Sequence, residues 1–175
     1  MAAILIVYST TDGHTLRICE RLRGLVEAQG HQVTLVPVAE AVDAELAPYD
    51  KIVVGASIRY GRHRPEVVAF IERNAQTLNR KASAFFSVSV VARKPEKNQP
   101  HTNPYVRKLL RKIAWRPREV GVFAGKIDYP RYAVLDRMII RFIMWLTGGP
   151  TDPKAVVEFT DWRQVEAFGG VIARM

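Results

Sequence analysis

The sequence is short of cysteine, of long apolar runs and of any signal for export, and each shortage excludes a class of protein. Its single cysteine, Cys19, cannot form an internal disulfide, which favours a reducing, cytoplasmic setting. No stretch approaches the roughly 18 apolar residues that a membrane-spanning helix needs. No basic leader with a cleavage motif precedes the first apolar run, so we expect no export signal. With 175 residues and no repeat or low-complexity linker, the chain is expected to form one domain, residues 1–175.

Acidic residues are also scarce, and the resulting positive charge is concentrated in one segment. The chain has 26 Lys and Arg against 17 Asp and Glu. Residues 93–141 contain 13 basic and 4 acidic residues, so this segment accounts for the whole excess. A local excess of this kind indicates a partner surface for an anionic lipid, an anionic small molecule or a nucleic acid. No nucleic-acid recognition module accompanies it, so we expect no nucleic-acid partner.

Short apolar runs alternate with amphipathic stretches along most of the chain. Strands are expected at residues 4–8, 32–38, 51–56, 83–90 and 119–124, and helices at 14–29, 65–78, 105–114 and 161–173. This alternation predicts an α/β fold with a doubly wound, five-stranded parallel sheet. The strand order expected is 2-1-3-4-5, in which ligands bind beyond the carboxyl ends of the strands.

The turn after the first strand has the composition of a phosphate-binding loop. It offers hydroxyl groups and the free N–H groups of a helix N-terminus, which together suit an anion. It contains no Lys or Arg, so neutral donors would have to hold the phosphate. The alternative is an ordinary strand-to-helix turn capped by Ser and Thr. The candidate phosphate-binding residues are Ser9, Thr10, Thr11, Asp12, Gly13, His14 and Thr15.

Two further loops are expected at the same edge of the sheet, after the third and fourth strands. Gly61 allows the backbone close to a flat ligand, and Tyr60 is placed to stack on a ring, although a packing role for a lone tyrosine is the alternative. Three converging loops favour a nucleotide carrying a ring system. The candidate ring-binding residues are Ser57, Ile58, Arg59, Tyr60 and Gly61 in one loop and Ser87, Val88, Ser89, Val90, Val91 and Ala92 in the other.

A long insertion, residues 125–153, separates the fifth strand from the last helix and exceeds an ordinary connection. Within it, residues 132–146 carry apolar side chains at helical spacing, with Arg137 and Arg141 one turn apart. One interpretation is a helix lying in a membrane interface, with Trp145 near the lipid headgroups. The other is a core helix that covers the edge of the sheet.

Several strings in this sequence carry a specific resemblance. The N-terminal half resembles flavodoxins, although Asp12 and His14 depart from their usual Thr-x-Thr-Gly-x-Thr loop. Over nearly its whole length the chain resembles the menaquinone-dependent protoporphyrinogen IX dehydrogenase family of bacterial haem synthesis. The strings that carry this resemblance are Gly55-Ala56-Ser57-Ile58-Arg59-Tyr60-Gly61, Val91-Ala92-Arg93-Lys94-Pro95-Glu96-Lys97, Tyr129-Pro130-Arg131-Tyr132 and Thr160-Asp161-Trp162.

The resemblance implies a flavodoxin-like fold, non-covalent FMN in the three loops, and an insertion that is associated with activity. It also implies oxidation of protoporphyrinogen IX, with electrons passed to a membrane quinone, menaquinone or ubiquinone. Arg93, Lys94 and Lys97 are the candidate residues for the substrate's two propionates. No catalytic acid or base is evident, and no metal site is expected.

These features place the expected protein in the cytoplasm, peripheral on the anionic inner-membrane surface. The sequence leaves open whether the chain forms a homo-oligomer. An electron-transfer flavodoxin, or an FMN-dependent quinone reductase, is the alternative function. Flavodoxins that shuttle electrons are generally acidic, whereas this chain is basic, which favours the enzyme.

Overall fold

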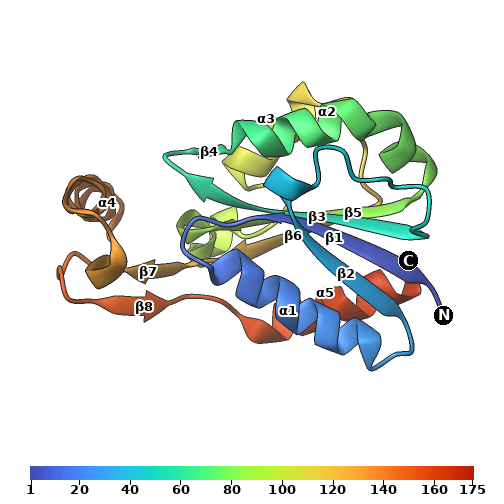
Figure 1. Ribbon diagram of the computed structural model, residues 1–175. Coiled ribbons are helices and arrows are strands. Elements are labelled where there is room, and N and C mark those ends of the chain that lie inside the picture. Colours follow the sequence, from blue (N-terminus) through green and yellow to red (C-terminus); the bar gives the residue numbers. More distant parts are fainter.

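The computed structural model describes residues 1–175 as an α/β fold built on a parallel sheet (Figure 1). Five strands run parallel in the order β2-β1-β3-β5-β6, which confirms the doubly wound order predicted from the sequence. The strands are β1 (Ala3–Ser9), β2 (Gln32–Pro37), β3 (Lys51–Arg59), β5 (Ala82–Ser89) and β6 (Glu119–Ala124), and β4 (Arg62–His63) pairs antiparallel with the end of β3. The helices are α1 (His14–Glu27), α2 (Pro65–Arg80), α3 (Pro104–Lys112), α4 (Val134–Thr147) and α5 (Trp162–Arg174).

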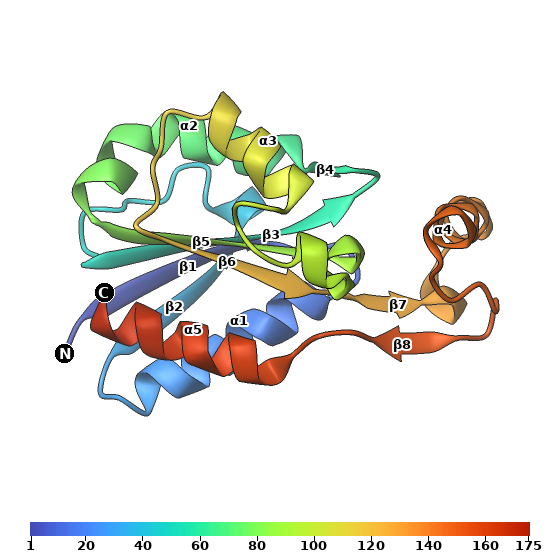
Figure 2. The same ribbon diagram turned by 180° about the vertical axis from the view of Figure 1, so that it is seen from behind.

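Helices cover both faces of the sheet, with α1 and α5 on one side and α2 and α3 on the other (Figures 1 and 2). Successive residues of a strand point to opposite faces, so each central strand contributes to two apolar cores. In β1, Ile4 and Ile6 pack towards α1 and α5, whereas Leu5 and Val7 pack towards α2 and α3. The central strands are therefore mostly apolar on both faces, because neither face meets water.

Gly55 shows how closely the strands pack against their neighbours. A Cβ atom at this position would overlap the ring of Phe86 on β5, the strand beside β3. Phe86 in turn packs with Phe123 and Phe168, at ring-centroid distances of 5.6 and 6.2 Å. This aromatic cluster fixes α5 on the sheet and positions the carboxyl ends of β3 and β5.

The chain between β6 and α5 forms a second unit that projects from one end of the sheet (Figures 1 and 2). It comprises β7 (Lys126–Asp128), α4 and β8 (Val156–Glu158), with β7 and β8 paired as an antiparallel hairpin. It has a small apolar core of its own: Ile127, Tyr129, Tyr132 and Met144. Its two ends meet at the sheet, where the Phe159 N–H donates to the Gly125 carbonyl at 3.0 Å.

Helix α4 lies at the far end of this unit and does not cover the edge of the sheet (Figure 1). Met144 is its only buried residue. The expectation of a core helix is therefore wrong, because the β7–β8 hairpin carries α4 away from the sheet. Its large apolar side chains are exposed instead: Val134, Leu135, Met138, Ile139, Phe142, Ile143, Trp145 and Leu146.

The remaining expectations about local structure agree with the structure to within a few residues, and Asp161 caps α5 by accepting from the Arg163 N–H at 3.0 Å. The β3–β4 and β7–β8 hairpins were not predicted, because strands of two or three residues carry no periodic pattern. No helix combines the length and apolar character needed to cross a membrane.

Candidate functional site

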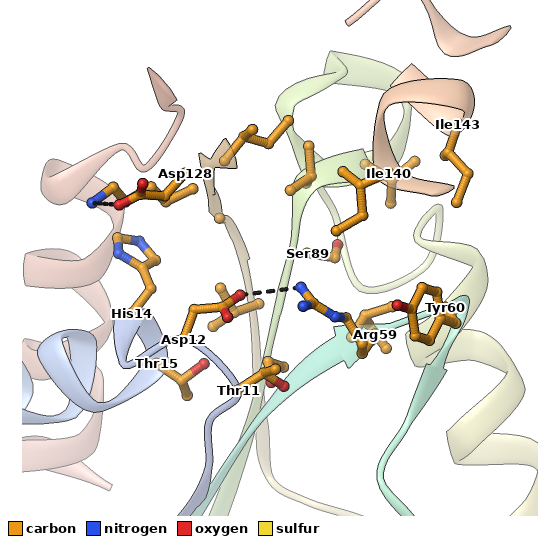
Figure 3. A pocket seen from close by; sticks show the side chains of 18 of the residues that line it. Thr11, Asp12, His14, Thr15, Arg59, Tyr60, Ser89, Asp128, Ile140 and Ile143 are labelled. Carbon is orange, nitrogen blue, oxygen red and sulfur yellow. Dashed lines mark hydrogen bonds and ion pairs between the residues drawn. The ribbon is translucent and has the colours of Figure 1, made fainter. Parts of the chain in front are cut away.

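One cavity opens where β1, β3, β5 and β6 end (Figure 3), on the side from which the β7–α4–β8 unit projects (Figure 1). It encloses about 200 Å³. Three walls come from the loop after β1, the β3–β4 turn and the segment after β5, and the fourth comes from the projecting unit. The last wall contributes Gly125, Lys126, Ile127, Asp128, Arg131, Tyr132, Ile140, Ile143, Met144 and Thr147.

The loop after β1 has the backbone geometry of an anion cradle. Gly13 precedes the first residue of α1 with a φ of 83°, a left-handed conformation that glycine adopts without steric cost. The Thr10 hydroxyl accepts from the Gly13 N–H at 3.0 Å and holds the turn. The first N–H groups of α1 have no helical carbonyl before them and point to this loop. They supply the positive end of the helix dipole.

Buried hydroxyl groups at this edge lack any hydrogen-bond partner. The three are Ser9 at the end of β1, Ser57 near the end of β3, and Ser89 at the end of β5. An unpaired buried hydroxyl costs about 1–3 kcal/mol, so native proteins rarely retain one without a reason. Three such groups at the carboxyl ends of three neighbouring strands indicate that a polar ligand satisfies them.

Arg59 joins three separate walls of the cavity. Its guanidinium lies 3.1 Å from the Asp12 carboxylate across the cavity (Figure 3) and 3.5 Å from Asp136 on α4. It also stacks over the ring of Tyr132, at 5.0 Å from the ring centroid. One side chain thereby links the loop after β1, the β3–β4 turn and the projecting unit.

Tyr60 is held in an uncommon backbone conformation. Its φ of 50° is left-handed, and Gly61 follows with a φ of 75°, as a two-residue hairpin turn of the primed type requires. A bulky residue with positive φ is strained, and such strain concentrates at ligand sites. The Tyr60 hydroxyl donates to Asp136, and this hydrogen bond is the main reason why the pKa of Tyr60 is raised.

His14 connects the start of α1 to the end of the projecting unit. The Thr160 hydroxyl donates to the Ala124 carbonyl at 2.7 Å, so His14 Nε2 is the donor in its 2.6 Å hydrogen bond to Thr160. Burial lowers the pKa of His14, and the nearby Glu158 carboxylate opposes that effect. The residue therefore favours its neutral form beside the anion cradle.

His63, behind the β3–β4 turn, is buried and should make stability depend on pH. Its Nε2 lies 2.9 Å from the Ser87 hydroxyl, and burial lowers its pKa to about 4. In an unfolded chain the pKa of histidine is about 6.5, so the unfolded state binds the proton first as pH falls. The free energy of unfolding should therefore decrease from about pH 6.5 down to about pH 4.

We expect the His63 contribution between pH 7 and pH 5 to be about 2 kcal/mol. His63→Gln, which cannot titrate, should remove that part of the pH dependence. Urea unfolding of both proteins at the two pH values measures it. Parallel losses of stability in wild type and variant would contradict the assignment.

The structure brings most of the predicted site residues to this one cavity. Those in its walls are Thr10, Thr11, Asp12, His14, Thr15, Ser57, Ile58, Arg59, Tyr60, Gly61, Val88, Ser89, Val90 and Val91. Ser9, Gly13, Ser87 and Ala92 lie outside the lining. Ser87 faces His63, whereas Ala92 is buried in the core between the sheet and α2.

Sequence reasoning missed several residues in or beside the cavity wall. Arg64 donates to the Thr11 hydroxyl, in the loop after β1, at 3.4 Å. It thus brings a positive charge to a loop that has no basic residue of its own. Tyr105 and the whole wall from the projecting unit were also absent from the predicted site. The signals for that wall came through the family resemblance, which picked out the string Tyr129-Pro130-Arg131-Tyr132 and associated the insertion with activity.

Arg93 lines the cavity, but its donors are engaged within the chain. Its guanidinium donates to the Val90 carbonyl at 3.1 Å and to the Thr147 carbonyl and hydroxyl at 3.1 and 3.3 Å. Burial lowers its pKa. Arg93 thus anchors the C-terminal end of α4, while Lys94 and Lys97 lie half-buried outside the cavity wall.

A five-stranded sheet of this order, with a hydroxyl-rich loop at its carboxyl edge, defines a protein of the flavodoxin type. A family model of the flavodoxin domain matches residues 5–154. Two solved structures share the fold. A flavodoxin from the domain Archaea has a TM-score of 0.53 and 14% identity, and the match covers 98% of this chain and 96% of that flavodoxin. Flavodoxin 1 from Bacillus cereus has a TM-score of 0.54 and 13% identity, and the match covers 98% of this chain and 97% of the other.

Two curated relatives are much more similar in sequence. The protoporphyrinogen IX dehydrogenase [quinone] of Escherichia coli K12 is 43% identical over 171 residues, covering 98% of this chain and 94% of the relative. The protein of the same name from Leishmania major is 41% identical over 172 residues, covering 98% of this chain and 74% of the relative. The chain therefore belongs to the quinone-dependent protoporphyrinogen IX dehydrogenase family, within the flavodoxin-type proteins.

Proposed function

We propose that this chain oxidises protoporphyrinogen IX to protoporphyrin IX with non-covalent FMN and passes the electrons to a membrane quinone. The sequence relationship supports the reaction, since both relatives carry that activity in their names. The single structural observation that carries the proposal is the set of three unpaired buried hydroxyls at the carboxyl edge of a flavodoxin-type sheet. The residues present therefore fit a polar cofactor.

The residues divide between the two ends of the cofactor. The N–H groups at the start of α1 and the hydroxyls of Ser9, Thr10 and Thr15 would hold the phosphate, with Arg64 nearby. Tyr60 and the residues after β5 would flank the ring. Held by these residues, FMN would supply two-electron redox chemistry between the macrocycle and a quinone, and conversion to protoporphyrin IX, which removes six hydrogens, would need three such cycles.

The fourth wall of the cavity supplies an apolar lining. Ile140, Ile143 and Met144 of α4 line the cavity, and Figure 3 shows Ile140 and Ile143 on the same side as the β3–β4 turn. Side chains of this type exclude water from the reacting atoms and favour apolar partners. A macrocycle and a quinone ring are both apolar and flat, so this wall suits either molecule.

We further propose that the outer face of α4 rests on an anionic membrane surface, where the quinone is dissolved. The exposed apolar side chains of α4 have no partner in the chain, and monomeric proteins seldom expose such a continuous apolar patch. Arg131 and Arg141, which are also exposed, lie in the same unit and suit anionic headgroups. The protein would then act as a peripheral protein on the cytoplasmic face.

Anaerobic addition of protoporphyrinogen IX to the FMN-loaded protein tests the proposed reaction. We expect the flavin absorbance near its visible maximum to bleach as the fluorescence of protoporphyrin IX appears, and a quinone to restore the absorbance. An electron-transfer flavodoxin or a quinone reductase would leave the flavin oxidised when protoporphyrinogen is the only reductant, and that result would overturn the proposal.

A further inference from the structure

A second cavity, of about 390 Å³, lies between α2, α3 and β4. These elements lie together above the same face of the sheet (Figures 1 and 2). Pro65, Val68, Ala69 and Leu109 give it an apolar part of its lining. We call this cavity the α2–α3 groove. The candidate phosphate and ring loops line the other cavity, and of their residues only Gly61 also lines this groove, so we do not expect the cofactor to occupy it.

The rim of the α2–α3 groove is strongly basic. Lys108 and Lys112 lie one turn apart on α3, and Arg62 comes from β4. All three are exposed, and none forms an ion pair with the one carboxylate of the groove, Glu72. Three cations beside apolar lining residues match a ligand that is apolar in its body and carries anionic arms.

The α2–α3 groove adjoins the candidate cofactor cavity. Gly61 and Tyr105 line both, and the Tyr105 ring packs against Gly61, at 3.7 Å from where a Cβ atom would lie. Gly61 belongs to the turn that carries Tyr60, the candidate ring-stacking residue. A flat molecule that reaches the flavin beside this turn would therefore extend, at the end away from the flavin, towards the basic rim of the α2–α3 groove.

Resting on the proposed function, we propose that the α2–α3 groove is the subsite for the propionate groups of protoporphyrinogen, with Lys108, Lys112 and Arg62 as their partners. Carboxylates on short flexible arms suit these lysines, which are free to adjust. Arg93 is less suited because its donors already hold the end of α4. Two of the 13 basic residues of the segment 93–141, Lys108 and Lys112, thus line the groove.

A pair of matched variants tests the subsite. Lys108→Gln with Lys112→Gln removes two charges from the groove, and Arg107→Gln with Arg111→Gln removes two charges from α3 outside the groove lining, about 100° around the helix. Both pairs lie at exposed positions, so folding should be unaffected. We expect the groove variant to raise the KM for protoporphyrinogen IX at least tenfold without changing FMN content, and the control to change it less than twofold.

A binding measurement separates the role of the carboxylates from that of the macrocycle. The probes are protoporphyrin IX and its dimethyl ester, which lacks the two charges, and fluorescence gives their affinities for the FMN-loaded proteins. Wild type should bind the diacid at least tenfold more tightly than the ester, and the groove variant should bind both equally. Glu72→Gln, which removes the repelling carboxylate, should strengthen binding of the diacid only.

The outcomes distinguish the two proposals. If protoporphyrinogen IX fails to bleach the flavin of the wild-type protein, the proposed function is wrong, whatever the groove binds. If wild type is reduced normally and the groove and control variants share the same KM and the same preference for the diacid, the groove is not the propionate subsite. Loss of diacid binding in both variants would point to general electrostatic attraction, which also contradicts a defined subsite.

Discussion

Ser9→Ala is expected to weaken FMN binding at least tenfold while leaving the protein without cofactor as stable as before, or slightly more stable. The Ser9 hydroxyl is buried and has no partner within the chain. A hydrogen bond to a charged group contributes about 1.5–3 kcal/mol, which the variant loses only when the phosphate is present. Fluorescence titration with FMN gives the affinity, and thermal unfolding of the apoprotein gives the stability.

Ser83→Ala is the matched control, because this serine is equally buried but fully bonded. Its hydroxyl donates to the Leu78 carbonyl at 2.7 Å and accepts from Trp115 Nε1 at 2.9 Å, at the other end of β5. This variant should lose about 1–3 kcal/mol of stability, since it leaves the buried Trp115 N–H without its partner, and should bind FMN normally. If Ser9→Ala destabilises the apoprotein and keeps its FMN affinity, the Ser9 hydroxyl has a structural role and does not bind the FMN phosphate.

The second large effect concerns the outer face of α4. Replacing Phe142, Trp145 and Leu146 by serine should reduce binding to liposomes that contain anionic lipid by at least tenfold. These side chains are 59%, 69% and 62% exposed, so the protein itself loses little packing. Burying a large apolar side chain completely contributes about 1.5–3 kcal/mol. Even partial insertion of the three side chains into the membrane would therefore change the affinity for vesicles by more than tenfold. Co-sedimentation with vesicles measures the loss.

The structure makes this experiment cleaner than one that includes Ile143, because Ile143 also lines the cavity and its loss would disturb the site. Val42→Ser is the control for general apolar adhesion, since Val42 is 49% exposed on a loop far from α4 in the chain. The triple variant of α4 should keep its FMN and its turnover with a soluble quinone. Full vesicle binding by the folded triple variant would exclude α4 as the anchor.

The parallel sheet could be predicted because its signals are local and repeated. Each central strand is apolar on both faces, as Ile4 to Val7 illustrate, and each is followed by a helix with one apolar side. Once the strand order is known, the loops that begin at Ser9, Ser57 and Ser87 must meet at one edge. The sequence therefore predicts the place of the site as well as the fold.

The interactions that complete the site could not be predicted, because they join residues far apart in the chain. Arg59 meets Asp12 and Asp136, which lie 47 and about 77 positions away, and nothing local marks either carboxylate as its partner. The direction in which α4 projects depends on a hairpin of three-residue strands. An apolar helical stripe looks the same in sequence whether it faces a core, a cavity or a lipid.

The hydrogen bond from Phe159 to Gly125 has a consequence for local unfolding. Because the two ends of the β7–α4–β8 unit already meet at the sheet, the unit can open without separating β6 from β5. Its small core should make it a separate cooperative unit, whose amides exchange with solvent at a lower free-energy cost than those of the central strands. Such independent opening offers large flat molecules a way in and out while the sheet keeps hold of the cofactor.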